Sequence, residues 1–522
     1  MSEWLSSAEV LPKVKAAVAM AGCLLLYLEA RRPRAATHRT RRWVAAILGV
    51  VAIAAYFQFG PLPGPGRYHA WEMYHYYVGA KHARELGYTR LYECAAVAEA
   101  ELGFGSAVRA RTLRNLRDDS VLTGAEALEH ADECRARFSA ERWRVFRSDV
   151  AWFRGSAGGG ELWTAMQNDH GFNPSPVWVL AGHALASLAP PSHHFLGVLA
   201  LIDVVLLGVL FALLGWAFGY RVAALAAVFL GTQAAAEMPW TGGAFLRMDW
   251  LLAATAALCL MRKRHFFWAG AALAYASLLR VFPVLLWAGP AVLAARQLVR
   301  HRRLAAPLKR LALGGAVATA LLVLPSLALS GPQAWPEFMS HTRMHATTPI
   351  SNHMSLRTLF SAAPETRLEA HHHPWLRPPV DTWTDARRDE LAHNRTAYLV
   401  AAAAMVIAFA YVVMALRSVW LATGLGTVLI VTLTDPSCYY YAFFLLAVPV
   451  ARARRSLEMA FLGLAGVSQL VISRYAWVDD RFWWLAGAYV AFAALLLVVF
   501  ARPPRPSFVL AQLRPKQPRE AS

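Results

Sequence analysis

The chain has 522 residues, of which 57% are hydrophobic and 16% are charged, and its mean hydropathy is +0.36. This composition excludes a soluble globular protein, because so much apolar surface must face lipid or other helices. The formal charge of +19 would suit a nucleic-acid-binding protein. The arginines and lysines lie in short connectors between apolar blocks, however, so we interpret them as a membrane topology signal and expect no nucleic acid partner.

The apolar residues form blocks of about 15–24 residues, the length of a membrane-spanning helix. We therefore predict an all-α polytopic membrane protein with a bundle of about 11–13 transmembrane helices. Its outer-face loops are expected to carry short helices. The Ala/Arg-rich composition and the lack of organelle signals favour a bacterial cytoplasmic membrane.

The first apolar block covers residues 10–28 and has no small-residue cleavage site before its Arg-rich end. A retained transmembrane helix is therefore expected rather than a signal peptide. With the basic cytoplasmic loop that follows, this extra helix makes up residues 1–42. The membrane core is assigned to residues 43–451, and residues 452–522 to a last transmembrane pair with a basic cytoplasmic tail.

Arginine and lysine in short loops mark the cytoplasmic side of a membrane protein. The basic stretches that fit this rule are residues 31–42, 262–264, 296–310 and 452–455 and the tail from residue 502. Counting crossings between them places the N-terminus outside.

Two long hydrophilic loops, residues 60–172 and 332–394, then share the outer face, where chemistry is expected. Cys94 and Cys134 lie in the first loop and could form a disulfide outside the cell. The sequence does not show that they meet.

Two shorter stretches of the core interrupt regular crossings. Residues 174–189 begin at Asn-Pro-Ser-Pro and end at a Pro-Pro pair, so a re-entrant or interfacial segment is expected. Residues 266–279 and 281–295 predict two short crossings that turn near Arg280, which places this arginine near the outer face.

An acidic and aromatic segment follows the second helix. Glu72, just above the membrane, is of the type that serves as a general base toward a sugar hydroxyl. Tyr74, His75 and Tyr77 beside it are candidates for substrate binding, the aromatic rings by stacking on sugar faces. An interfacial aromatic belt with a solvated glutamate is an equally good interpretation.

Three charged residues occur at the outer ends of apolar blocks. Arg280 is expensive at membrane depth unless it has a partner or a function, and its fork of donors suits a lipid phosphate. A snorkelling arginine at a turn explains it equally well. Arg247 and Asp249 could hold a pyrophosphate or orient a sugar, although most such pairs are structural ion pairs.

The second loop contains Asn352, His353 and Arg357 within about one helical turn, a set that could bind phosphate or sugar hydroxyls. A polar loop in water is at least as good an interpretation. His341, His345 and the three histidines from residue 371 raise the question of a metal, but no carboxylate or cysteine stands at a convincing ligand spacing. We therefore expect solvated histidines and no metal site. The segment 435–441 predicts a helix start capped by Asp435 or Ser437.

Taken in order, these segments resemble the GT-C fold glycosyltransferases, in particular the polyprenol-phosphate-sugar-dependent enzymes of glycosyltransferase family 87, which include mycobacterial mannosyltransferases. The resemblance covers most of residues 43–450. It is carried by the following residues: Glu72, Tyr74, Tyr77, Gly79-Ala80, Gly87 and Leu91-Tyr92 in the first loop, Asn173 to Pro176, Arg280 to Pro283, Asn352, Ser355, Leu356 and Arg357 in the second loop, and Ser437 to Tyr441.

The resemblance implies an inverting sugar transfer from a polyprenyl phosphate donor to an acceptor hydroxyl, with Glu72 as base and no cofactor. Arg280 and Arg357 would hold the leaving phosphate, and His353 would orient donor or acceptor. The chain departs from the pattern by Glu for Asp at 72, by Arg for Lys at 280, by its extra N-terminal helix and by a lengthened first loop. The longer loop leaves the acceptor open among a glycan, a glycolipid and a protein.

Two other classes of protein would fit the same charges. A transporter or flippase of an anionic lipid-linked substrate would need functional charges in mid-membrane and usually an internal repeat, whereas the polar residues here collect at one face. A scaffold would bind a partner through its outer loops, and substitution of Glu72 and Arg280 would then leave its activity unchanged.

Overall fold

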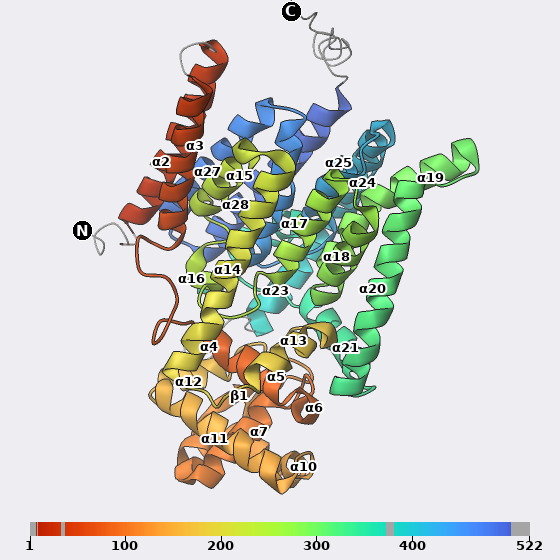
Figure 1. The fold of residues 1–522 in the computed structure, drawn as a ribbon. Helices are drawn as coiled ribbons and strands as arrows, with labels where there is room; N and C mark the ends of the chain where they lie inside the picture. Colours follow the sequence, from red (N-terminus) through yellow and green to blue (C-terminus); the bar gives the residue numbers. More distant parts are fainter. Residues whose placement is uncertain (1–6, 8, 33–36, 372–380, 503–522) are drawn as a thin grey trace, which may run out of the picture.

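The computed structural model describes residues 7, 9–32, 37–371 and 381–502 of the chain. It is mostly helical, and a tall bundle of helices stands on a smaller layer of short helices (Figure 1). The prediction of an all-α polytopic fold is confirmed.

Within the described residues, seven helical stretches are long and apolar enough to cross a membrane. They are α2 (Val10–Arg31), α14 (His193–Phe218), Phe282–His301, which joins η3 (Phe282–Trp287) to α19 (Ala288–His301), α20 (Ala306–Ser330), α24 (Arg395–Ala415), α27 (Ser456–Arg474) and α28 (Val478–Ala501). Val205, Leu321 and Ile407 on these helices are each more than 60% exposed, as expected of side chains that face lipid. The chain is therefore a multi-pass membrane protein.

Further helices complete the bundle. They are α3 (His38–Tyr56), α13 (Pro176–Ala186), α15 (Tyr220–Thr232), α16 (Met238–Thr241), α17 (Asp249–Arg262), α18 (Phe266–Leu279), α25 (Val419–Leu425), α26 (Thr427–Leu433), η6 (Cys438–Leu446) and η7 (Val448–Arg452). Helix α13 has 11 residues, too few to cross a bilayer, in line with the interfacial or re-entrant segment expected there.

Close packing in the bundle depends on small residues. A Cβ atom added to Gly270 of α18 would lie 1.9 Å from the carbonyl oxygen of Leu311 in α20. In the same way, a Cβ atom added to Gly314 of α20 would lie 1.9 Å from the carbonyl oxygen of Phe267 in α18. Backbones approach this closely only where glycine leaves room, a common device of membrane helices. These contacts fix α18, and with it the position of Arg280.

The N-terminal helix pair packs against the rest of the bundle. Helix α2 contacts α27 and α15, and α3 contacts α15. Arg221 of α15 binds Glu29 of α2 at 2.7 Å and Glu458 of α27 at 2.5 Å. The extra N-terminal helix thus shares an interface with both the core and the C-terminal pair.

The first long loop folds into a compact layer below the bundle. Its elements are α4 (Ala70–Met73), η1 (Tyr74–Val78), α5 (Gly79–Lys81), α6 (Ala83–Leu86), α7 (Leu91–Glu99), η2 (Ala100–Phe104), α8 (Gly105–Arg109), β1 (Thr112–Arg114), β2 (Val121–Thr123), α9 (Gly124–Glu129), α10 (Ala131–Ala136), α11 (Ala140–Ser156) and α12 (Glu161–Met166). Strands β1 and β2 pair antiparallel, with Leu113 opposite Leu122. A disulfide between Cys94 and Cys134 joins α7 to α10. We call residues 60–172 the outer domain.

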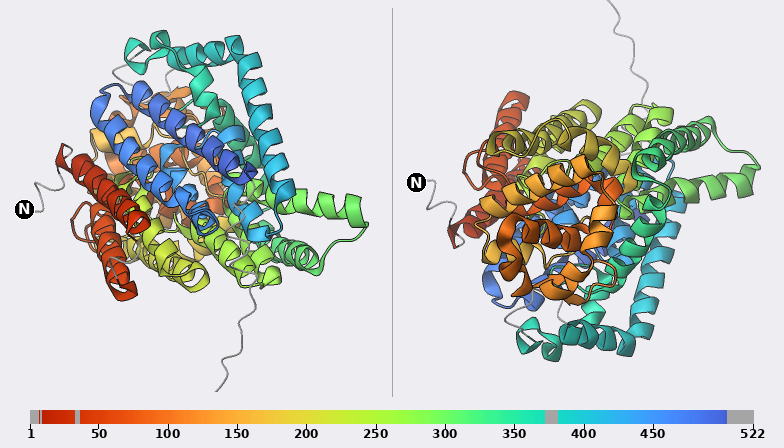
Figure 2. Two further views of the ribbon diagram at one scale, coloured as in Figure 1. Left: turned by 90° about the horizontal axis from the view of Figure 1, so that it is seen from above. Right: turned by 90° about the horizontal axis from the view of Figure 1, so that it is seen from below.

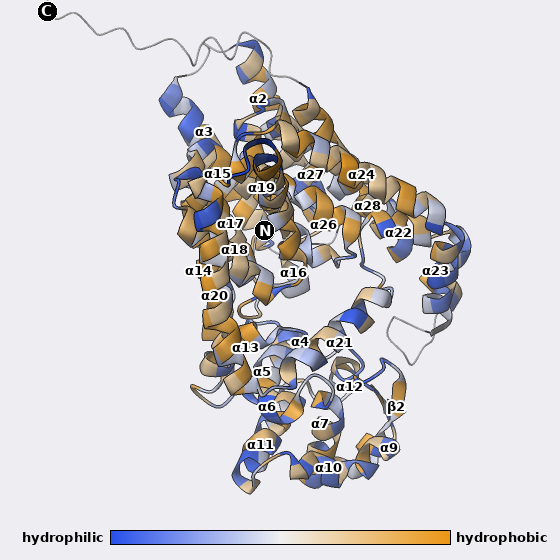
Figure 3. Ribbon diagram, turned by 90° about the vertical axis from the view of Figure 1, so that its right-hand side faces the viewer, coloured by the Kyte–Doolittle hydropathy of each residue, from blue (hydrophilic) through white to orange (hydrophobic). Residues whose placement is uncertain are grey.

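The second long loop lies on the same side of the bundle as the outer domain (Figure 1). It contains α21 (Ala334–Thr347), α22 (Leu356–Ser361), η4 (Pro364–Thr366), η5 (Leu368–His371) and α23 (Asp381–His393). Seen from below, the outer domain covers the middle of the bundle (Figure 2, right). Bundle helices such as α14 and α20 are largely hydrophobic, whereas α11 and α23 carry many hydrophilic residues (Figure 3).

Candidate functional site

A cavity of about 400 Å³ lies where the bundle meets the outer domain and the second loop. Six of the ten residues predicted to form a site line it. They are Glu72, His75, Arg247, Arg280, His353 and Arg357. Residues separated by up to 285 positions in the chain thus meet at one place.

Glu72 enters the cavity from a short helix whose start is fixed by a side chain. The backbone N–H of Glu72 donates to Nδ1 of His69 at 3.3 Å, and the chain then continues as the π-helical segment η1. The carboxylate of Glu72 forms an ion pair of 3.2 Å with Nε of Arg247, whose side chain is 5% exposed. The Arg247 guanidinium also lies over the Tyr76 ring, 4.5 Å from its centroid. This site therefore places the Glu72 carboxyl group beside a cation.

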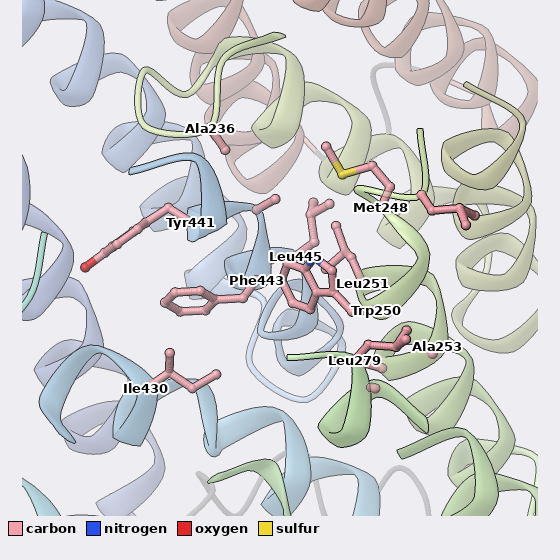
Figure 4. Close-up of a cluster of buried hydrophobic side chains, with 14 of the residues drawn as sticks. Ala236, Met248, Trp250, Leu251, Ala253, Leu279, Ile430, Tyr441, Phe443 and Leu445 are labelled. Atoms are coloured by element: carbon pink, nitrogen blue, oxygen red, sulfur yellow. The ribbon is translucent and has the colours of Figure 1, made fainter. Parts of the chain in front are cut away.

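Arg280 lies in the cavity wall at the break between α18 and η3, as the sequence predicts. It follows Leu279 of a tightly packed apolar cluster that includes Trp250 and Phe443 (Figure 4). Its Nη1 donates to the Leu279 carbonyl at 3.2 Å and its Nη2 to the Tyr76 hydroxyl at 3.4 Å, while its buried Nε has no hydrogen-bond partner among the described residues. Arg280 is 6% exposed, and in the described part of the chain no carboxylate lies within 4.0 Å of it.

A cation in this environment needs a counter-charge. Desolvation of an ionised group is unfavourable unless it is paired and hydrogen-bonded. Arg357 likewise forms no ion pair with a described carboxylate. Its Nη1 donates to the Ala346 carbonyl at 2.8 Å. Both guanidinium groups line the same cavity, which is therefore suited to bind an anion.

A second carboxylate, Asp169, lines the cavity and was missed by sequence reasoning. Trp71 Nε1 donates to its Oδ2 at 2.6 Å. Burial alone would raise the pKa of Asp169, but the neighbouring His75 and His170, together with the Trp71 hydrogen bond, keep this pKa below its usual value. Asp169 is therefore ionised at neutral pH and able to accept a hydrogen bond from a hydroxyl.

The second loop is tied to the start of η6 across the cavity. The Met354 N–H donates to the Pro436 carbonyl at 3.1 Å, and the Cys438 N–H donates to the Asn352 carbonyl at 2.9 Å. Two segments that carry the family resemblance in the sequence are thus neighbours in space.

Asp435 holds this junction together. It pairs with Nδ1 of His353 at 3.2 Å and accepts a hydrogen bond of 2.6 Å from the Ser355 hydroxyl. Burial would raise the pKa of Asp435, but His353 and the Ser355 hydrogen bond hold it well below its usual value. Ser437 occupies the N-cap position of η6, as one of the two predictions had it, but its side chain makes no capping hydrogen bond, and Asp435 lies outside the cap. The carboxylate orients His353 instead.

Four predicted site residues do not line the cavity. Tyr74 packs between Phe153 and Trp163 inside the outer domain. The Tyr77 hydroxyl donates to the Ala189 carbonyl at 2.6 Å. These two tyrosines anchor the outer domain because they lie on the face of the helix opposite to Glu72.

The other two residues are close to the cavity but do not reach it. Asp249 is buried at the start of α17 and accepts a hydrogen bond of 2.7 Å from the Trp250 N–H. It does not pair with Arg247, which binds Glu72 instead. Asn352 contributes its backbone carbonyl to the junction with Cys438, while its side-chain oxygen is buried without a hydrogen bond.

His75 lines the cavity but is engaged in internal hydrogen bonds. Its Nδ1 lies 2.8 Å from the Trp71 carbonyl oxygen, and its Nε2 lies 2.6 Å from the Tyr92 hydroxyl. The same hydroxyl accepts a hydrogen bond of 2.9 Å from the Gly171 N–H. His75 thus fixes the loop that carries Asp169.

The expectation of solvated histidines in the second loop is wrong for His341 and His345. Both line the cavity, and His341 is 4% exposed. They face inward because α21 packs its His341 face against Tyr88 of the outer domain. Of the histidine run, His371 ends η5, and the other two lie outside the described residues.

In the described part of the chain, no group of three or more His, Cys, Asp or Glu side chains is arranged to hold a metal ion. Comparisons of the chain with protein-family models, with curated proteins and with solved structures found no match.

Proposed function

We propose that this protein is an integral membrane glycosyltransferase that moves a sugar from a polyprenyl phosphate donor to an acceptor hydroxyl at the outer face of the membrane. The observation that carries the proposal is Arg280, a buried guanidinium in the cavity wall without a carboxylate partner among the described residues. The phosphate of a lipid-linked donor would supply the missing counter-charge in the cavity where the bundle meets the outer domain.

In the proposed reaction, the acceptor oxygen attacks the anomeric carbon while a cavity carboxylate takes its proton. The bond between the anomeric carbon and the phosphate oxygen breaks, and its electron pair stays on the phosphate. Arg280 and Arg357 stabilise the charge that develops there. Inversion at the anomeric carbon follows from this single displacement.

Among the described residues, three carboxylates line the cavity. Asp435 is held by His353 and Ser355, so Glu72 and Asp169 are the candidates for the base. Glu72 is the residue that the family resemblance favours, and its carboxyl group pairs with Nε of Arg247 at 3.2 Å. Asp169 belongs to the outer domain, accepts a hydrogen bond from the Trp71 indole N–H and lines the same cavity. The two assignments make different predictions for single substitutions.

The outer position of the site is part of the proposal. The Cys94–Cys134 disulfide supports it, because disulfides persist in oxidising compartments and are rare in the cytoplasm. The basic connectors support the same orientation by an independent rule. A bacterial cytoplasmic membrane, with the cavity toward the periplasm or exterior, fits both.

The proposal is tested with the full chain purified into lipid nanodiscs and a panel of radiolabelled polyprenyl phosphate sugars. Wild type is compared with Glu72→Gln, Asp169→Asn and Arg280→Gln for release of sugar from the lipid. We expect Arg280→Gln and the variant that lacks the base to lose at least about a hundredfold of the rate.

Matched controls are Glu129→Gln and Arg144→Gln, which change exposed residues of the outer domain. Both should release sugar at the wild-type rate. Failure of folded wild-type protein to release sugar from any donor would overturn the proposal. Transbilayer movement of the intact donor without release would indicate the transporter alternative.

A further inference from the structure

Three imidazole rings that line the cavity lie close to one another. His341 and His345 lie one turn apart on the same face of α21, and His170 follows α12 in the outer domain. The ring centroids of His341 and His345 are 4.3 Å apart, and those of His170 and His345 are 5.2 Å apart. We call these three residues the imidazole wall.

The hydrogen-bonding capacity of this wall is mostly unused. His170 Nδ1 pairs with Asp119 Oδ1 at 3.1 Å. The rings of His341 and His345 make no hydrogen bond to any described residue, and the buried Nε2 atoms of all three histidines have no partner. Leaving a buried polar group unsatisfied costs about 1–3 kcal/mol, so native structures normally avoid it. A bound molecule at this wall would remove that cost.

The charge state of the wall indicates which molecule it suits. Burial lowers the pKa of His341 to about 4 and that of His345 well below its usual value, so both rings are neutral at pH 7. A neutral imidazole offers one donor and one acceptor nitrogen. A hydroxyl group also donates and accepts, whereas a phosphate only accepts and requires cations. Among the described residues, the arginines that line this cavity are Arg247, Arg280 and Arg357, and Arg357 reaches the end of α21 through its hydrogen bond to the Ala346 carbonyl.

An aromatic surface accompanies the imidazole wall. Phe338 lies one helical turn before His341 on α21 and lines the cavity with it. Tyr88 of the outer domain packs on both, with ring centroids 5.6 Å from Phe338 and 6.0 Å from His341. Apolar ring faces beside neutral polar nitrogens suit a sugar, which has apolar C–H faces and hydroxyl edges.

We propose that the imidazole wall is the subsite for a neutral, polyhydroxylated acceptor, and that its hydroxyls bind His341, His345 and His170 while the donor phosphate binds the arginines. This inference rests on the proposed function and deepens it by naming the acceptor class. It places the attacking hydroxyl on the wall next to Asp169, because His170 is the next residue in the chain.

The inference is tested by equilibrium binding, which needs no turnover. Saturation-transfer NMR measures the binding of methyl α-mannoside, methyl β-glucoside, methyl β-galactoside and methyl α-arabinofuranoside to the full chain in nanodiscs. We expect the double variant His341→Leu/His345→Leu to weaken binding of the preferred glycoside about tenfold, through loss of one or two hydrogen bonds. The double variant His341→Gln/His345→Gln, which keeps polar groups, should restore part of it.

Two further measurements separate binding from folding and from the donor site. Leucine replaces polar groups that are already unpaired, so the melting temperature of the leucine variant should not fall. Binding of mannose 1-phosphate should depend on Arg280 and not on the two histidines. His393→Gln, an exposed histidine on α23, is the matched control and should change nothing.

The outcomes are distinct for the two proposals. Equal glycoside affinity in wild type and in the leucine variant, or no binding of any of the four glycosides by wild type, overturns the acceptor subsite even if the protein is an active transferase. Glycoside binding that depends on the histidines, without release of sugar from any donor lipid, supports the subsite and removes the transferase assignment.

Discussion

Two arginines of this protein have opposite surroundings. Arg221 is paired on both sides, with Glu29 at 2.7 Å and Glu458 at 2.5 Å. Arg280 is more deeply buried and has only a carbonyl and a tyrosine hydroxyl as partners among the described residues. A structural arginine stabilises the fold, whereas an arginine reserved for a ligand destabilises it until the ligand binds.

We therefore expect Arg280→Met to change the melting temperature of the ligand-free protein little, because the buried charge has no ion pair within 4.0 Å among the described residues and interacts at longer range with Asp203 and Asp249. The same change should weaken binding of a polyprenyl phosphate sugar about 10–100-fold, through loss of hydrogen bonds to a charged group. Thermal unfolding and donor binding are measured on the same preparation in nanodiscs.

Arg221→Met is the comparison, and it should do the reverse. It leaves Glu29 and Glu458 without their common partner, so the melting temperature should fall while donor affinity stays at the wild-type value. A large loss of stability in Arg280→Met with unchanged donor affinity would show that Arg280 is a structural residue.

At the scale of elements, the outer domain depends on a covalent link between α7 and α10. The Cys94–Cys134 disulfide closes a loop with a sequence separation of 40. Loop-closure entropy predicts a stabilisation of about 4 kcal/mol for a loop of this size. We expect Cys94→Ser/Cys134→Ser to lower the melting temperature of the outer domain and to increase its proteolysis by trypsin.

The control for this change is Cys438→Ser, which removes a free cysteine of the bundle. It should not alter the rate at which trypsin cleaves the outer domain. Identical cleavage of wild type and the double serine variant would mean that the disulfide adds no stability to this layer.

The buried histidines of α21 should make the stability of the folded protein depend on pH. The ordinary pKa of His341 is 6.5, and burial lowers it to about 4 in the folded protein, with His170 lowering it further and Asp119 opposing the shift. The unfolded chain therefore binds the proton more readily, and stability must fall as the pH drops from about 6.5 toward 4. His345, whose pKa is also lowered, adds to this trend.

The measurement is the melting temperature at pH 7 and at pH 4.5 for wild type, His341→Gln and His393→Gln. We expect His341→Gln to lose less stability on acidification than wild type, since it has one proton fewer to bind. The exposed His393 should leave the wild-type difference unchanged. An equal loss in all three proteins would contradict the neutral, buried state of His341.

The sequence predicts some elements of the site better than others, and the difference has a physical cause. Arg280 can be predicted because a charge between two apolar blocks is visible in the sequence itself. The aromatic residues from 74 to 77 do not by themselves indicate which of them line the cavity, and Tyr74 and Tyr77 pack away from it. Residues three and four positions after Glu72 lie on the same face of the helix as Glu72. These residues are His75 and Tyr76, and both line the cavity.

Asp169 and Asp435 could not be recognised in the same way. Each becomes part of the site through contacts with distant residues, Asp169 with Trp71 and Asp435 with His353. Hydropathy and charge rules predict which side of the membrane a loop occupies, but not how two loops fold on each other. The helical bundle was therefore predictable, whereas the wall of the site formed by α21 was not.

At the scale of the whole molecule, the proposal depends on the side of the membrane that the cavity faces. The outer domain and the second loop lie at one end of the bundle, and the C-terminal end of α2 and the start of α3 lie toward the other (Figure 1). Ser156 of α11 and Arg303 between α19 and α20 are both exposed. When either is replaced by cysteine, labelling with a membrane-impermeant maleimide shows on which side of the membrane it lies. Cys23→Ser is included in the background because Cys23 is only partly buried.

We expect Ser156→Cys to be labelled in intact cells, and Arg303→Cys to be labelled only after the membrane is permeabilised. This pattern follows from the excess of arginine in the α19–α20 connector and from the disulfide at the opposite end. The reverse pattern would place the cavity in the cytoplasm, where nucleotide sugars are available. A donor carried across the membrane on a lipid would then be unnecessary, and the reason for a phosphate-binding Arg280 at the bilayer surface would be lost.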